Sequence, residues 1–282
     1  MRLASLYSGG KDSSFSLYLA EQQGHEVPYL VNIVPEGRAS WLFHTPNLGA
    51  VPAMAEAMGK ELVIGRSTGE EGSDTEGLRG ALEGLDVDGV VSGVSWSDYQ
   101  WERMNAVCGS LGLRFFAPMW RKDQDLLMET MLESGVEAVI VGCFAEGFDE
   151  SWLGRPIDAG CVEDLRRLRS EYGVSIMGEG GEYESMTLHS PSFRHRLRMG
   201  PAERVWKRNS GTLEVSSLAP QADRPSGSGR APGLNLPSLS ALATTDMEEH
   251  DIAAAASIGR SSMTIPKRMS RDPAATGMHI AL

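Results

Sequence analysis

Residues 3–14 have the sequence LASLYSGGKDSS, in which a short apolar run leads into Ser-Gly-Gly-Lys-Asp-Ser and a helical pattern follows. Adjacent Gly9 and Gly10 let the backbone turn sharply and expose consecutive N–H groups, and the following helix adds the positive end of its dipole. Hydroxyls and a cation surround the same turn: Ser8, Lys11, Ser13 and Ser14. These features suit a pyrophosphate group, although the spacing of a Walker A loop is absent. A plain strand-to-helix corner is the competing interpretation.

The composition indicates a globular protein with an acidic surface. The chain has 282 residues, enough for one large or two small domains, and 41% of them are hydrophobic. A net charge of −12 argues against a large nucleic-acid footprint, so no direct nucleic-acid partner is expected. No apolar run approaches the length of a membrane span, and no signal-peptide pattern is evident, so no membrane partner is expected either.

The three cysteines, Cys108, Cys143 and Cys161, lie far apart and form no Cys-x-x-Cys pair. This spacing argues against a zinc ribbon or a thioredoxin-like redox site. Scattered thiols fit a reducing cytoplasm, where the default role of a cysteine is that of a small buried apolar residue.

Apolar runs alternate with helical patterns through the first half of the chain. Strands are predicted at 2–8, 27–34, 61–64, 89–93, 114–117 and 136–141, and helices at 13–23, 48–58, 78–85, 98–111 and 123–134. The alternation predicts right-handed crossovers and an α/β fold with a doubly wound, mostly parallel sheet. Ligands bind beyond the carboxyl ends of such strands. The turn at Ser8, the region of Pro35, segment 92–95 and the loop after Val141 should therefore share one rim.

The pattern changes after Gly142 and predicts a smaller α+β part. A loop is expected over 145–156, a helix over 158–172, strand-like residues to about 197, and a strand or hairpin within 203–216. From Pro220 the composition shifts to Pro, Ser, Gly and Ala, which predicts a largely disordered tail, with a short helix near 246–256 as an option.

A second informative segment is GEGGEYES at 178–185. Its glycines allow close backbone approach, and Glu179, Glu182 and Glu184 can accept hydrogen bonds from an ammonium group or hold Mg²⁺, which prefers oxygen ligands. A solvated acidic turn is the alternative, and composition alone favours it.

Several motifs together carry a family resemblance. The loop at 8–13 resembles the phosphate loop of the ATP pyrophosphatases, which split ATP into AMP and pyrophosphate. The other motifs, in order and at family-like spacing, are Phe43-His44-Thr45-Pro46-Asn47, Asp98-Tyr99-Gln100 with Arg103, Pro118-Met119-Trp120 with Asp123-Gln124, Leu153-Gly154-Arg155 with Ile157-Asp158, and residues 178–184. Over about residues 1–200 the chain resembles the diphthine–ammonia ligase family of ATP pyrophosphatases.

The resemblance implies a nucleotide-binding domain over 1–143 and a smaller substrate-binding domain over 144–218, with 219–282 as a tail. It implies amidation of the diphthine carboxylate on translation elongation factor 2. ATP and ammonium would be consumed, Mg²⁺ would be required, and diphthamide, AMP and pyrophosphate would be formed. Adenylation would give the carboxylate a good leaving group, and ammonia would then attack. A cytoplasmic location follows, and a homodimer is left open.

The resemblance also assigns residues. Catalytic roles fall on Lys11, Asp12, Glu182 and Glu184, with Asp12 as the Mg²⁺ ligand. Nucleotide-binding roles fall on Ser8, Gly9, Gly10, Lys11, Asp12, Ser13, Ser14 and His44. Substrate-binding roles fall on Tyr99, Gln100, Arg103, Gly154, Arg155, Asp158, Glu179, Gly180, Gly181, Glu182, Tyr183 and Glu184. The three glutamates would form a cage that binds ammonium and accepts its proton.

Plainer interpretations remain for several of these residues. A lone histidine such as His44 is more often structural. Residues 99–103 could be a solvated helix face, and Arg155 and Asp158 could simply pair with each other. Five tryptophans are interpreted mostly as core or pocket wall: Trp41, Trp96, Trp101, Trp120 and Trp152.

Three other functions compete. The first is tRNA thiolation or lysidine-type modification, which the cysteine spacing and the net charge disfavour. The second is a same-family amide ligase that acts on a small carboxylic acid. The third is a nucleotide sensor without catalysis, against which the intact Lys11 and the three glutamates argue.

Overall fold

The computed structural model describes residues 1–36, 48–68 and 72–221. Its first ten elements are β1 (Arg2–Leu6), α1 (Lys11–Gln22), β2 (Glu26–Pro35), the 3₁₀ turn η1 (Leu48–Ala50), α2 (Val51–Met58), β3 (Glu61–Ser67), α3 (Ser73–Leu82), β4 (Gly89–Val91), α4 (Asp98–Ser110) and β5 (Arg114–Phe116). The remainder are α5 (Gln124–Glu133), β6 (Glu137–Cys143), the 3₁₀ turn η2 (Glu150–Trp152), α6 (Ala159–Tyr172), β7 (Tyr183–His189), β8 (Leu197–Met199), β9 (Ala202–Lys207), β10 (Ser210–Val215) and β11 (Leu218–Pro220).

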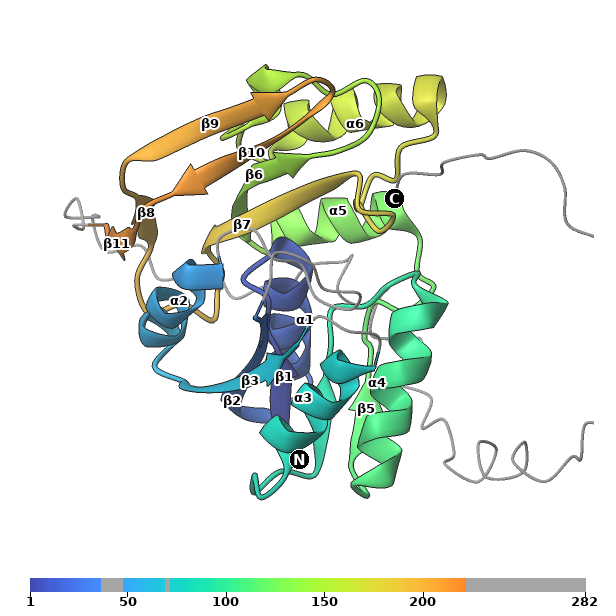
Figure 1. Cartoon of the computed structure of the whole chain (residues 1–282), viewed down its shortest axis with the longest axis vertical. Coiled ribbons are helices and arrows are strands. Elements are labelled where there is room, and N and C mark those ends of the chain that lie inside the picture. The colour runs from blue at the N-terminus through green and yellow to red at the C-terminus, as the bar shows by residue number, and fades with distance from the viewer. Residues whose placement is uncertain (37–47, 69–71, 222–282) are drawn as a thin grey trace, which may run out of the picture. The chain divides into compact units, whose positions relative to one another are not determined.

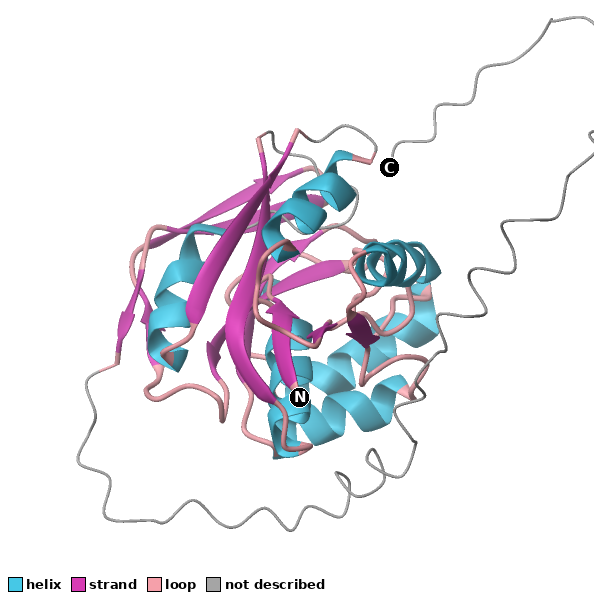
Figure 2. Ribbon diagram, turned by 90° about the horizontal axis from the view of Figure 1, so that it is seen from below, coloured by secondary structure: helices cyan, strands magenta, loops and turns pink. Residues whose placement is uncertain are grey.

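The first half forms a five-stranded sheet in the order β3-β2-β1-β4-β5, with every neighbouring pair parallel. Successive side chains of β1 divide between two cores: Leu3 belongs to one, and Ala4 and Leu6 belong to the other. The first core includes residues of α1 and α2, and the second those of α3 and α4, so helices cover both faces (Figure 2). The predicted doubly wound α/β fold is confirmed.

The strand order reverses direction between β1 and β4. From β1 the chain moves outward through β2 to β3, then crosses back to β4 on the other side of β1. Ligands of open parallel sheets bind at such a switch point, beyond the carboxyl ends of the strands that flank it. The sequence places the Ser8 turn after β1 and the segment 92–95 after β4, so these two segments border the crevice.

A second sheet has the order β7-β6-β10-β9 and is antiparallel. The prediction that residues 136–141 extend the parallel sheet was wrong, because this strand is β6 of the second sheet. The loop after Val141 therefore does not belong to the parallel rim. An apolar run of this length predicts a buried strand but does not reveal its partner. The predicted hairpin within 203–216 is confirmed as β9 and β10.

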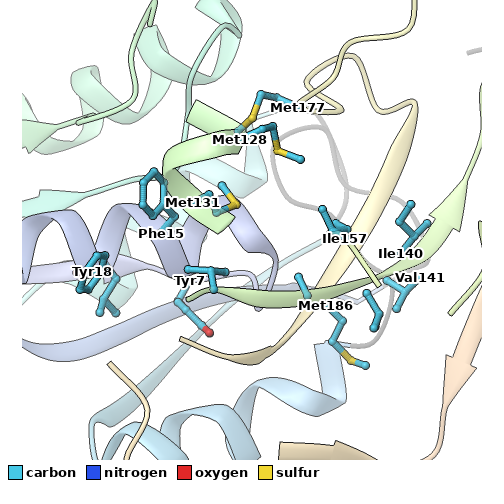
Figure 3. Packing of buried hydrophobic residues seen from close by; sticks show 14 of the residues in the cluster. Tyr7, Phe15, Tyr18, Met128, Met131, Ile140, Val141, Ile157, Met177 and Met186 are labelled. Carbon is cyan, nitrogen blue, oxygen red and sulfur yellow. The ribbon is translucent and has the colours of Figure 1, made fainter. Parts of the chain in front are cut away.

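The two sheets share one hydrophobic core. Phe15 and Tyr18 of α1, Met128 and Met131 of α5 and Ile140 of β6 belong to a single buried cluster (Figure 3). Figure 1 shows the second sheet beside the edge at which β1 ends. Burial of these side chains is the largest stabilising contribution available to such a protein, so the second sheet is held firmly against α1.

Two helix boundaries differ from the predicted ones for local reasons. Helix α1 begins at Lys11 rather than residue 13, directly after the extended Gly10. Helix α3 covers 73–82 instead of 78–85, since its first turn is polar and its backbone leaves the helical region at Glu83. The predictions for His44, for the tail from residue 222 and for a helix near 246–256 lie outside the described residues.

Candidate active site

A pocket opens at the switch point between β1 and β4. The mouth of this pocket is partly open to solvent. Its lining residues come from the ends of β1, β2 and β4 and from α1, α4 and segment 177–179: Leu6, Tyr7, Ser8, Asp12, Ser13, Val31, Asn32, Ile33, Ser92, Gly93, Val94, Gln100, Met104, Met177, Gly178 and Glu179. The predicted rim therefore forms a concave site with apolar walls and a polar end.

Ser8, Asp12 and Ser13 form the polar end of this pocket, beside the Gly9–Gly10 turn. Gly9 has φ +86°, a conformation that favours glycine, and Gly10 is the extended N-cap of α1. The Gly10 N–H donates to Ser8 Oγ at 3.4 Å, and the Ser13 hydroxyl donates to the Gly10 carbonyl at 3.0 Å. The turn thus presents the start of a helix to the pocket, as an anion-binding loop does.

Lys11 is buried behind the turn and does not line the pocket. Its Nζ donates to Asp12 Oδ2 at 2.8 Å and to the Met177 carbonyl at 2.6 Å, and it lies 5.0 Å from the centre of the Tyr183 ring. Burial disfavours the ammonium form, but the interactions with Asp12, Tyr183 and Glu179 together outweigh burial and raise the pKa of Lys11. Lys11 therefore ties Asp12, which does line the pocket, to the segment that precedes Glu179.

One face of β7 contacts helix α1 and the Ser8–Gly9–Gly10 turn, here called the phosphate-loop turn. Alternate residues of a strand point to the same side, and here Tyr183, Ser185 and Thr187 all meet α1 or the turn. The Lys11 N–H donates to Ser185 Oγ at 3.1 Å, and the Ser14 hydroxyl donates to Thr187 Oγ1 at 3.0 Å. The Thr187 N–H donates to the Gly9 carbonyl at 2.9 Å. Ser14, predicted to bind nucleotide, is thereby turned away from the pocket into a buried hydroxyl network.

Replacement of Thr187 by valine should test that network. The Tyr7 hydroxyl lies 2.8 Å from Ser14 Oγ, and Thr187 is fully buried. Valine keeps the volume but removes one hydroxyl, which leaves a buried partner unsatisfied. We expect Thr187→Val to lower the free energy of unfolding by about 1–3 kcal/mol in urea denaturation. Thr212→Val, the same exchange at a half-buried position of β10, should change it by less than about 0.5 kcal/mol; equal effects would contradict the network.

Glu179 brings the acidic-glycine segment into the pocket. The Ser95 hydroxyl donates to Glu179 Oε1, and the Trp96 N–H donates to Oε2 at 3.4 Å. Burial, followed by the negative charge of Asp12, raises the pKa of Glu179, and the bond from Ser95 offsets part of this rise. A carboxylate with a raised pKa at the polar end of a pocket is suited to proton transfer.

Glu182 and Glu184 take different partners. Glu182 accepts from the N–H groups of Ser175 at 2.9 Å and Gly180 at 2.8 Å, so its carboxylate braces the turn around Gly181, which has φ +79°. Glu184 alternates with Tyr183 and Ser185 along β7 and therefore lies on the face opposite α1. Neither lines the pocket. Within the described residues no group of three or more His, Cys, Asp or Glu side chains could hold a metal ion.

Of the three site residues predicted on α4, Gln100 lines the pocket, whereas Tyr99 and Arg103 do not. Ser97 caps the helix by accepting from the Gln100 N–H at 3.3 Å, and Gln100 lines the pocket. The Arg103 guanidinium lies 3.4 Å from the centre of the Tyr99 ring, and both side chains are half-buried. Tyr99 and Arg103 thus pack on each other along one helix face and are not among the pocket-lining residues.

The predicted residues between η2 and α6 do not line the pocket. The option that Arg155 and Asp158 pair with each other was wrong. Arg155 pairs with Asp164 at 2.6 Å, and Asp158 is the N-cap of α6, where it accepts from the Cys161 N–H at 2.8 Å. The Gly154 N–H donates to the Ile140 carbonyl at 2.8 Å. This segment therefore stabilises the second sheet and its helix.

Asn32 and Met104 line the pocket but were not among the predicted site residues, whereas Ser92 and Gly93 were predicted only as part of the rim segment 92–95. Asn32 is buried and donates to the Tyr7 carbonyl at 2.8 Å, which fixes the end of β1. A Cβ atom on Gly93 would lie 2.7 Å from the backbone carbon of Asp12. The glycine at the end of the predicted strand 89–93 was the available signal, because a glycine there allows a backbone to approach closely.

Replacement of Gly93 by alanine should therefore push α1 away from β4. The obstructing atoms belong to the backbone of Asp12 and Ser13, which no side-chain rotation can relieve. We expect the free energy of unfolding to fall by about 1–3 kcal/mol and ATP affinity to fall at least about tenfold, measured by thermal unfolding and calorimetry. Gly109→Ala in α4, where a Cβ meets open space, should be neutral or stabilising; unchanged ATP affinity in the Gly93 variant would refute the close-approach argument.

The doubly wound sheet and the glycine turn at its switch point define an α/β protein of the nucleotide-binding class. Comparison with known proteins identifies a family within this class. Residues 1–115 match the diphthamide synthase N-terminal domain, and residues 123–219 match the diphthamide synthase C-terminal domain. The chain belongs to the diphthamide synthase family, as the sequence resemblance implied.

Relatives named diphthine–ammonia ligase are found in several vertebrates. The protein of Danio rerio is 36% identical over 227 residues, which cover 73% of this chain and 89% of the relative. That of Bos taurus is 34% identical over 245 residues, covering 79% and 89%, and that of Homo sapiens is 34% identical over 228 residues, covering 73% and 85%. These names describe carbon–nitrogen ligases, which confirms the predicted enzyme class of the family.

Two further observations concern domain limits and membranes. The two family matches and the two sheets divide the chain between β5 and α5, whereas the predicted boundary lies at residue 143. Among the described residues, no helix is both long and apolar enough to cross a membrane.

Proposed function

We propose that this chain amidates the carboxylate of diphthine on translation elongation factor 2, with ATP and ammonium as co-substrates and diphthamide, AMP and pyrophosphate as products. The observation that carries the proposal is the meeting of the phosphate-loop turn and Glu179 in one pocket at the switch point. One part suits the phosphates of ATP, and the other suits proton transfer from ammonium. The names of the relatives support the choice of reaction.

The phosphates would bind at the start of α1. Gly9 and Gly10 supply backbone N–H groups, Ser8 and Ser13 supply hydroxyls at the pocket wall, and the helix dipole favours the negative charge that develops on pyrophosphate. The apolar walls formed by Val31, Ile33 and Met104 suit the flat adenine base. His44 keeps its proposed nucleotide role on the resemblance alone.

Asp12 fits a role in holding Mg²⁺. It contributes one carboxylate to the pocket, and Mg²⁺ at nucleotide sites is commonly held by one or two carboxylates together with the substrate phosphates. A single protein carboxylate is therefore sufficient, and no larger acidic cluster is required. The bound ion would neutralise phosphate charge, while Lys11 keeps the Asp12 carboxylate oriented through its 2.8 Å bond.

We assign the proton-accepting role to Glu179. The predicted cage of three glutamates would need three convergent carboxylates, but Glu182 braces its own turn and Glu184 lies on the other face of β7. Glu179 would receive a proton as ammonia attacks the activated carboxyl carbon. In this proposal Glu182 and Glu184 are positioning residues, as are Gly180, Gly181 and Tyr183, and the second sheet presents the segment to the pocket.

The deciding experiment measures AMP and pyrophosphate release by the purified chain with elongation factor 2 that carries diphthine. Release that requires this protein, ATP and ammonium, together with a gain of diphthamide by mass spectrometry, is the expected result. Cleavage supported instead by a small carboxylic acid would favour the related amide ligase, and cleavage supported by tRNA would favour the modification enzyme. ATP binding without cleavage under all these conditions would indicate a sensor and overturn the proposal.

A further inference from the structure

An aromatic surface beside the pocket holds a cation between two tryptophans. The Arg121 guanidinium carbon lies 4.9 Å from the centre of the Trp96 ring and 5.0 Å from that of Trp120. Arg121 Nη2 contacts both carboxylate oxygens of Asp98 at 2.6 Å. We call Trp96, Trp120 and Asp98 the cation box, with Arg121 as its internal occupant. Trp101 supports the box by stacking on Trp120 at a centroid distance of 5.5 Å.

The backbone holds the two sides of the box together. The Arg121 N–H donates to the Ser95 carbonyl at 2.8 Å, and the Trp96 indole N–H donates to the Lys122 carbonyl at 3.2 Å. Arg121 has φ +55°, a conformation that residues with a Cβ rarely adopt. Such a conformation persists only where its surroundings impose it, and here it directs the guanidinium onto the indole faces.

The box and the pocket share a wall. Trp96 of the box and its neighbour Ser95 are the two residues that donate to the carboxylate of Glu179. Glu179 lines the pocket. A group bound in the box would therefore lie next to the Glu179 carboxylate.

We propose that the cation box binds the quaternary ammonium group of diphthine, an inference that rests on the function proposed above. In diphthine a trimethylammonium group sits on the carbon that carries the carboxylate to be amidated. A site that places this carboxyl carbon within reach of the ammonia that Glu179 deprotonates must therefore place the cation only a few bonds away. A quaternary ammonium has no N–H to donate, so aromatic faces and a carboxylate are the groups that can recognise it.

In this proposal the trimethylammonium group displaces the Arg121 guanidinium from the cation box. Its side chain is 44% exposed and that of Asp98 is 65% exposed, and ion pairs so exposed contribute little to stability. A guanidinium that leaves the box regains hydrogen bonds with water. A trimethylammonium group makes no such bonds in water and loses less on entering, so the exchange favours the substrate.

Choline and its uncharged analogue 3,3-dimethylbutan-1-ol test the box without ATP or elongation factor. In titrations of the full chain followed by tryptophan fluorescence, choline should bind, whereas the analogue of the same shape should bind at least about threefold more weakly. Trp96→Leu should weaken choline binding about threefold to thirtyfold, and Arg121→Ala should tighten it because the box is vacated. Trp206→Leu on β9 is the matched control and should leave it unchanged. Equal binding of both compounds, or wild-type affinity in Trp96→Leu, overturns the proposal.

Kinetics with diphthine-bearing elongation factor 2 test the substrate assignment. Trp96→Leu should raise KM for that protein about threefold to thirtyfold and leave KM for ATP unchanged. Should Trp96→Leu fail to fold by circular dichroism, Trp96→Phe keeps an aromatic face and should show a smaller rise. An unchanged KM for the protein in the folded variants overturns the assignment. Absence of turnover in the wild type would instead count against the proposed function, and the choline titration would still decide whether the box binds quaternary ammonium.

Discussion

Replacement of Glu179 by glutamine is expected to lower the rate of amidation about 10²–10⁴-fold, the range associated with loss of a general base. Glutamine keeps the shape of the side chain and accepts a bond from Ser95 or Trp96, but it takes up no proton from ammonia. ATP affinity should stay within a factor of about two, because the Glu179 carboxylate is hydrogen-bonded by Ser95 and Trp96 and not by the phosphate-loop turn. Diphthamide formation and ATP binding are the two measurements.

Two carboxylates serve as comparisons for this variant. Glu171→Gln, at the exposed end of α6, should have wild-type kinetics. Glu184→Gln should retain most activity, since Glu184 faces away from α1. Wild-type amidation in Glu179→Gln at limiting ammonium would contradict the role of Glu179, and a larger loss in Glu184→Gln would return that role to the predicted cage.

The pH dependence gives an independent test of Glu179. Its pKa is raised by burial and by Asp12, so its ionised, proton-accepting form appears only above the ordinary glutamate range. Activity should therefore rise with pH through a limb that is absent in Glu179→Gln. The free energy of unfolding should change in the opposite direction. Between the unfolded and the folded pKa of Glu179 the folded protein binds more protons than the unfolded chain. The stabilisation that protonated Glu179 gives is therefore lost as pH rises through the folded pKa. Unfolding measured in urea at several pH values should show that slope in the wild type alone.

Replacement of Lys11 by methionine is expected to reduce ATP cleavage at least about 10²-fold. Methionine fills the buried volume, but it neither orients Asp12 nor donates to the Met177 carbonyl, which loses its 2.6 Å partner. Both sides of the pocket then lose a restraint, because Asp12 and segment 177–179 are joined through the same ammonium. We expect the amidation rate to fall together with ATP cleavage, measured by pyrophosphate release and by diphthamide formation.

The control for this variant is Lys207→Met on the exposed strand β9, which should have wild-type rates. Circular dichroism and urea denaturation separate a local effect from unfolding, since Asp12 is 29% exposed and water can stabilise its unpaired charge. A folded Lys11→Met protein that cleaves ATP normally would show that neither the cation nor its restraint on Asp12 is required.

The sequence was informative wherever neighbouring residues decide the outcome. Alternation of apolar runs and helical patterns predicted the parallel α/β sheet, and the Gly9–Gly10 pair predicted the turn at its switch point, because both depend on local backbone preferences. The glycines and carboxylates of segment 178–185 predicted a binding role only when read together with the other motifs. The family followed from several short motifs in a fixed order, without knowledge of any contact.

The tertiary structure decided where the side chains of these segments point and which strands pair. Composition treats Glu179, Glu182 and Glu184 as one cluster, but a turn and a strand with a two-residue repeat send their side chains to three different places. The partner sheet of residues 136–141 was likewise undetermined, since an apolar strand pairs equally well in either sheet. Lys11, expected to face phosphate, is instead buried between the turn and Met177. Side-chain direction depends on contacts between residues more than a hundred positions apart, and these contacts exist only once both sheets have packed against α1.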